Sequence, residues 1–113
     1  MSIYTFQASA GTTTGKTIKV TTGATLASVN TVIACASVVA TQMLVTNNGT
    51  VAAFIRMSGE STPSASPSDI PVLANSSRIF TNPVPFGTLG VAVYPSVAVA
   101  VDVYFTPGTG GCI

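Results

Sequence analysis

The chain has 113 residues, a net charge of +1 and only 6 % charged residues, against roughly 25 % in an average globular protein. This composition excludes the clustered cations with which proteins bind nucleic acid, and also the basic amphipathic face of a membrane-surface protein. Hydrophobic residues make up 47 % of the chain, enough for one core at this length. We therefore expect one domain with neither nucleic acid nor membrane as a partner.

Residues 1–15 are expected to form an extended N-terminal arm or an edge strand. The stretch IYTFQA is extended in character, and ASAGTTTG would give an arm flexible reach. The first ten residues lack a basic start followed by an apolar run, so we expect no secretory signal. We expect the protein to be made in the cytoplasm.

Residues 10–17 match a permissive phosphate-binding pattern, Ala-x-x-x-x-Gly-Lys-Thr. That chemistry requires a helix after the glycine-rich turn, because the helix N-terminus holds the phosphates. The sequence after Lys16 is TIKVTTGA, which favours extended structure. We interpret the segment as a turn that leads into a strand.

The rest of the chain has the period of strands. TIKVTT predicts one strand, and 24–41 is expected to be mostly strand. We expect three hairpins: 43–47 with 50–57 around Asn48-Gly49, DIPVL with SRIFT around ANS, and LGVAVY with VAVAVDVYF around a tight Tyr94-Pro95-Ser96 turn. The polar, proline-rich segment 58–69 is expected to be a long exposed loop.

About eight short strands separated by Gly, Pro, Asn and Ser predict an all-β fold, a single antiparallel β-sandwich of jelly-roll or immunoglobulin-like type. We place it at 16–107, with 108–113 as a flexible tail. Of the two cysteines, Cys35 is expected to be a buried free thiol, whereas Cys112 lies in the tail.

The last predicted hairpin has one face of small residues, namely Gly90, Ala92, Ala98 and Ala100. If exposed, this face would be flat and nearly uncharged, a surface that proteins normally protect. Either the opposite sheet or a neighbouring subunit would cover it. The second alternative predicts a homo-oligomer, a dimer or a trimer.

Catalysis is not expected. The chain has no histidine, which excludes Ser-His and Cys-His relays. Its three carboxylates, Glu60, Asp69 and Asp102, have no spacing that favours a catalytic pair or a metal site. We predict that the protein is not an enzyme, has no cofactor and holds no metal.

The segments VTNNGTVAAFIRMSG, SDIPVLANSSRIF and GTLGVAVYPSVAVAVDVYF, within about 42–105, are similar in style to small all-β virion proteins of tailed bacteriophages. The chain most resembles the capsid decoration, or cement, proteins. This resemblance implies a structural protein on the outer capsid surface of a virion, where it bridges subunits of the major capsid protein and stabilises the shell, often as a dimer or trimer.

We expect contacts to the capsid or between subunits in the N-terminal arm, in the proline-rich loop and on the small-residue face. The residues are Ile3, Tyr4, Phe6, Pro63, Pro67, Ala98 and Ala100. The alternative is a glycan- or receptor-binding module of a phage tail, a fibre or a cell surface. An exposed cluster of Tyr94 and Tyr104 with loop residues around Glu60 and Asp69 would favour that alternative.

Overall fold

The computed structural model describes residues 4–8, 16–35, 40–85 and 87–112. These residues form nine strands and no helix. The strands are β1 (Tyr4–Ala8), β2 (Ile18–Thr21), β3 (Val29–Ala34), β4 (Gln42–Asn47), β5 (Ala53–Ser58), β6 (Ile70–Val72), β7 (Ser76–Thr81), β8 (Thr88–Pro95) and β9 (Asp102–Cys112). The predicted all-β sandwich is therefore confirmed.

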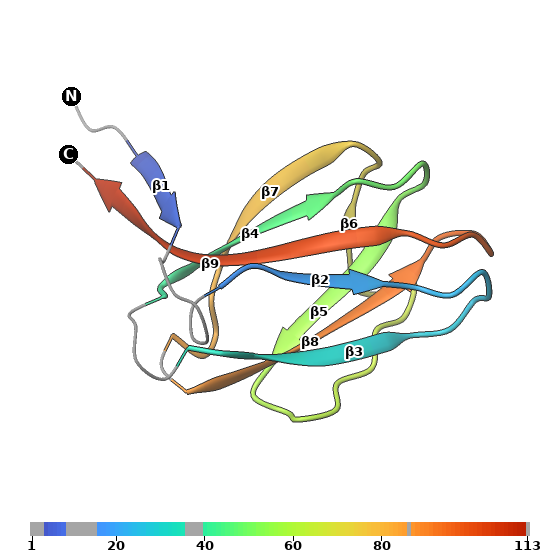
Figure 1. Cartoon of the computed structure of the whole chain (residues 1–113), viewed down its shortest axis with the longest axis horizontal. Coiled ribbons are helices and arrows are strands. Elements are labelled where there is room, and N and C mark those ends of the chain that lie inside the picture. The colour runs from blue at the N-terminus through green and yellow to red at the C-terminus, as the bar shows by residue number, and fades with distance from the viewer. Residues whose placement is uncertain (1–3, 9–15, 36–39, 86, 113) are drawn as a thin grey trace.

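Two antiparallel sheets pack face to face (Figure 1). In one sheet the order is β1-β9-β4-β7, and β2 pairs with β9 on the same side as β1; in the other it is β3-β8-β5-β6. The pairs β2·β9, β3·β8, β4·β7 and β5·β6 are nested, as in a long antiparallel ribbon that has been folded over and rolled up. This is the strand order of a jelly roll, one of the two sandwich types that the sequence predicts.

The core lies between the sheets and is built by alternate residues of each strand. Val91 and Val93 of β8 face Val103 and Phe105 of β9, and all four are buried. The alternation of apolar residues in the sequence thus correctly identifies the side of these strands that faces the core. It fails for Val97 and Val99, because residues 96–101 are a loop and both side chains are exposed.

The three predicted hairpins are wrong. In each case the two segments form strands, but the strands belong to opposite sheets: β4 and β5, β6 and β7, and β8 and β9. The Asn48-Gly49 turn is not a type I′ turn either, because neither residue has a positive φ. The alternating pattern shows which side of a strand is buried, but it does not identify the neighbouring strand.

Buried polar side chains anchor the corners where the chain crosses between the sheets. Asn47, at the β4–β5 corner, donates through Nδ2 to the carbonyls of Val51 and Val72, at 3.0 and 2.9 Å, and accepts the Gly49 N–H at 2.8 Å. Asn82, at the β7–β8 corner, donates to the Ala40 carbonyl at 2.7 Å and accepts the Val84 N–H at 2.9 Å. These bonds offset the cost of burying each amide and fix the crossings.

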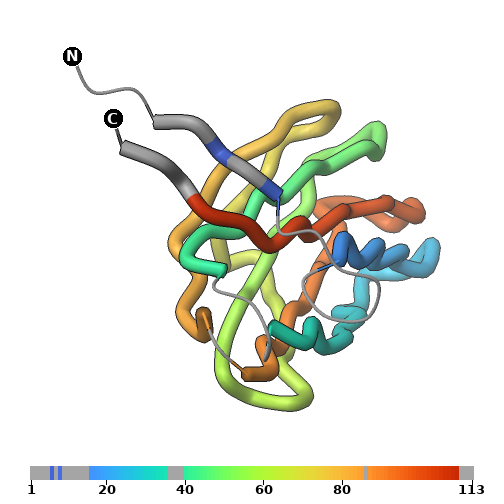
Figure 2. Tube along the Cα trace, turned by 60° about the vertical axis from the view of Figure 1, so that its left-hand side comes forward, coloured from blue at the N-terminus to red at the C-terminus, as the bar shows by residue number. Residues whose placement is uncertain are grey.

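The ends of the chain lie together. Tyr4–Ala8 pairs with the last five residues of β9, from Gly108 to Cys112. Figure 1 shows the two paired strands extending away from the body, and Figure 2 shows the coloured part of β9 leading towards this end. The N-terminal segment is thus an edge strand over 4–8. Residues 108–112 are strand rather than the expected tail, because β1 supplies their hydrogen-bonding partner.

Candidate functional site

Four loops gather at the end of the sandwich opposite β1, on the right-hand side of Figure 1. They are the connections 22–28, 48–52, 73–75 and 96–101, and we call the surface that they form the loop end. Jelly-roll topology brings them together, because each connects a strand of one sheet to a strand of the other at the same end. None of their residues is charged.

Backbone hydrogen bonds join these loops to one another. The Thr22 N–H donates to the Val101 carbonyl at 3.0 Å, and the Val101 N–H donates to the Thr22 hydroxyl at 2.9 Å. The Ser96 N–H donates to the Ala52 carbonyl at 3.0 Å. These bonds join three of the four loops, and the fourth, 73–75, follows Val72, whose carbonyl accepts the Asn47 side chain beside 48–52. The loop end is therefore a connected surface.

The loop end is also apolar. Among the described residues, the exposed large hydrophobic side chains are Leu26, Val32, Ile70, Leu73, Ile79, Val97 and Val99. Four of these belong to the loop end: Leu26 (56 % exposed), Leu73 (66 %), Val97 (47 %) and Val99 (38 %). Several exposed apolar side chains gathered on one uncharged surface are typical of a protein–protein contact.

The predicted contact residues do not form one site. Ala98 and Ala100 lie exposed in the loop end. Tyr4 and Phe6 belong to β1 at the other end of the molecule, where Phe6 is half-buried. Ile3 lies outside the described residues. Sequence reasoning missed Leu26 and Leu73, because it placed both in segments predicted as strand, 24–41 and DIPVL, and gave no sign that either side chain would be exposed.

The proline-rich loop is not simply an exposed segment. Pro63 and Ala65 are buried, and the Ala65 N–H donates to the Ser28 hydroxyl at 2.9 Å. A Cβ at Gly90 would collide with the Glu60 carbonyl and approach the Pro63 Cδ to 2.9 Å. Of the two prolines predicted as contacts, Pro63 is therefore inside the fold, and Pro67 is exposed.

This loop also corrects the prediction of a small-residue face. Gly90 lies beneath the 59–69 loop and Ala92 is also buried, whereas Ala98 and Ala100 lie in a different region, the loop end. Gly90 leaves space for the chain's own loop. Neither the opposite sheet nor a second subunit is needed to cover it, so this observation no longer argues for an oligomer.

The tyrosine cluster expected for a glycan site is not formed. Tyr94 lies on β8 and Tyr104 on β9, in opposite sheets, and each is half-buried. Asp69 lies 3.8 Å from Arg56, in an ion pair, and Glu60 is exposed. The two tyrosines therefore do not lie on one surface, and the expected cluster of four residues is not formed.

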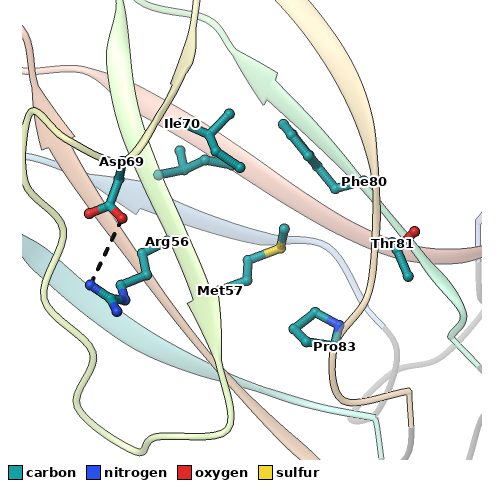
Figure 3. A pocket seen from close by; sticks show the side chains of 8 residues that line it. Arg56, Met57, Asp69, Ile70, Phe80, Thr81 and Pro83 are labelled. Atoms are coloured by element: carbon teal, nitrogen blue, oxygen red, sulfur yellow. Dashed lines mark ion pairs between the residues drawn. The ribbon is translucent and has the colours of Figure 1, made fainter.

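A separate pocket of about 380 Å³ opens at one side of the sandwich, between β5, β6 and β7. Figure 3 shows Met57, Ile70, Phe80 and Pro83 around one space, with the Arg56–Asp69 pair beside it. Arg78 lies outside this lining; its guanidinium stacks 5.0 Å from the Phe80 ring and donates to the Pro71 carbonyl. Sequence reasoning did not predict this pocket, because it depends on which strands form the sheet edges.

The thiol of Cys35 is buried and free, as predicted. Burial raises its pKa, and the neighbouring Asn82 amide lowers it by a smaller amount. A thiol with a raised pKa is a weak nucleophile.

Within the described residues, no group of three or more His, Cys, Asp or Glu side chains could hold a metal ion, and no helix could cross a membrane.

Lys16 and Thr17, the last residues of the phosphate-loop pattern, are exposed and lead directly into strand β2. The helix that a phosphate site requires does not follow them.

Comparison of the chain with known protein families, with curated proteins and with solved structures gave no match.

Proposed function

We propose that this protein is a non-enzymatic structural component of a phage virion. In this proposal it decorates the outer surface of the capsid and stabilises it by bridging subunits of the major capsid protein. The carrying observation is the loop end, a connected surface with four exposed large apolar side chains and no charged residue. Jelly rolls recur among viral capsid proteins and lectins, which supports the proposal at the level of the fold alone.

A repeating lattice suits a contact of this kind. Many copies that bind one shell can each bind weakly, because adjacent contacts act together. The low charge of the chain also leaves little electrostatic repulsion between neighbouring copies. A dimer or trimer remains part of the proposal, and light scattering at two concentrations tests it separately.

The test is co-sedimentation of the purified protein with capsids that lack it, taken from the phage or prophage whose genome carries the gene. We expect saturable binding that Val97→Asp weakens at least tenfold, because a charge would be buried in an apolar contact. The matched control is Val32→Asp, since Val32 is similarly exposed but lies on β3, outside the loop end. Absence of binding by the unmodified protein, or equal loss in both variants, would contradict the proposal.

A further inference from the structure

Strand β5 is longer than its edge neighbour. β5 covers Ala53–Ser58, whereas β6 pairs with its first three residues, Ala53, Phe54 and Ile55. On the other side, β8 pairs with all six residues of β5. The edge of β5 beside 56–58 therefore has no strand next to it among the described residues. We call this place the notch.

The backbone of Met57 faces the notch. Pro71 has no N–H, and its carbonyl accepts a bond from the Arg78 side chain, at 3.1 Å, so its polar groups point away from β5. In an antiparallel pair, successive residues bond alternately to one neighbour and the other. Ala53 and Ile55 consequently bond to β6, and Met57, two residues further on, presents its N–H and C=O to the open side.

The pocket adjoins this free backbone. By register, Ile70 lies opposite the buried Ile55, yet 46 % of its surface is exposed. It faces the same space as Met57, Phe80 and Pro83 (Figure 3). A strand added beside Met57 would direct an inward side chain into this space of about 380 Å³.

In the ion pair next to the notch, the arginine is the more exposed partner. Arg56 and Asp69 lie 3.8 Å apart, but the arginine side chain is 48 % exposed and the aspartate side chain 19 %. One oxygen of Asp69 also accepts the Ser66 N–H at 2.8 Å. Arg56 precedes Met57 in β5, and its side chain lies on the opposite face of that strand. In an added strand, the residue that follows or precedes the inserted apolar residue would also point to that face, near the guanidinium of Arg56.

We propose that the notch binds an extended segment of a partner protein in which a bulky apolar residue is adjacent to an acidic residue. The segment adds to β5 through the backbone of Met57, the apolar side chain fills the pocket, and the carboxylate pairs with Arg56. The occupant is a different protein. A second copy could offer only Glu60, Asp69 or Asp102, which are the acidic residues of the chain.

None of these three acids supplies the required pair in an available segment. Glu60 lies between Gly59 and Ser61, Asp69 belongs to the notch itself, and Asp102 is in β9, which is paired on both sides. The inference goes beyond the proposed function and does not depend on it, because the notch is separate from the loop end. Its test uses no capsid, so the two proposals can fail independently.

The experiment is an NMR titration of the full chain with the acetylated, amidated peptide Thr-Phe-Asp-Thr. We expect millimolar binding, with shifts at the amides of Arg56, Met57 and Thr81. Thr-Ala-Asp-Thr should bind at least about tenfold more weakly, because it leaves the pocket empty. Thr-Phe-Lys-Thr should also bind more weakly than the aspartate peptide, and Arg56→Gln should remove the difference between these two.

A pocket-filling variant gives a second readout. Ile70→Trp should abolish binding, whereas Ile79→Trp should retain it, since Ile79 is 51 % exposed on β7 but is not part of the pocket lining. If Ile70→Trp does not fold, the three peptides and the Arg56→Gln variant still test the proposal. Equal binding of all three peptides, or no shift in the notch, would overturn the proposal. Concentration-dependent shifts of the same amides without peptide would also overturn it, since they would identify a second copy as the occupant.

Discussion

The side-chain amide of Asn47 donates to the carbonyl oxygen of Val72 at 2.9 Å, across the gap between the two sheets. Asn47 ends β4 in one sheet and Val72 ends β6 in the other. The same side chain closes the corner through Val51 and Gly49. One buried amide thus joins the 48–52 loop to the end of β6, from which the 73–75 loop begins, and a polar residue lies beneath the apolar surface.

Asn47→Ala should therefore lower the free energy of unfolding by about 2 to 4 kcal/mol, because it leaves buried backbone groups without a partner. Urea unfolding followed by circular dichroism measures this. Asn48→Ala is the control: Asn48 is adjacent but exposed, so its change should stay within about 0.5 kcal/mol. Similar losses in both variants would show that the corner does not depend on the Asn47 side chain.

Gly90→Ala should destabilise the protein by about 1 to 3 kcal/mol, because the added Cβ meets the Glu60 carbonyl and Pro63. Hydrogen exchange should show faster exchange of the Ala65 amide, which donates to Ser28. Gly23→Ala is a suitable control, since the nearest atom to its Cβ would be the Thr25 hydroxyl oxygen at 3.8 Å. Unchanged exchange in Gly90→Ala would mean that the loop does not rest on β8.

Replacing Leu26 and Val97 by serine should change the unfolding free energy of the isolated chain by no more than about 0.5 kcal/mol each, because both side chains are exposed. Val93→Ala, a truncation in the core, should cost about 1 to 3 kcal/mol in the same urea titration. A large loss at Leu26 or Val97 would show that these residues stabilise the fold itself, and would weaken their interpretation as a contact surface.

The raised pKa of Cys35 predicts a loss of stability at alkaline pH. The folded state holds the thiol proton more tightly than the unfolded chain does, so this contribution is complete below the ordinary thiol pKa of about 8.5 and is lost as the pH rises through the folded pKa. Urea midpoints between about pH 7 and 9.5 should fall more in the unmodified protein than in Cys35→Ala. Parallel curves would contradict the prediction.

The sequence was enough to predict an all-β sandwich, because side-chain alternation is a local property of a strand. The signals were the alternation of apolar residues, the Gly, Pro and Asn residues between the alternating segments, and the low content of charged residues. They also predicted the buried thiol of Cys35, whereas Ala98 and Ala100, expected on a strand face, lie in the loop 96–101. The alternating pattern did not determine which strands pair with one another. The Asn48-Gly49 sequence is compatible with a hairpin, but here the chain crosses to the other sheet, and the side chain of Asn47 bonds to the backbone of that corner.

Only the tertiary structure decided which segments lie side by side. The loop end collects residues from 22 to 101, and the notch exists because β6 stops opposite Ile55 while β5 continues to Ser58. The cover over Gly90 comes from a loop about thirty residues earlier in the chain. These surfaces depend on long-range contacts and on the lengths of neighbouring strands, and local periodicity carries no information about either.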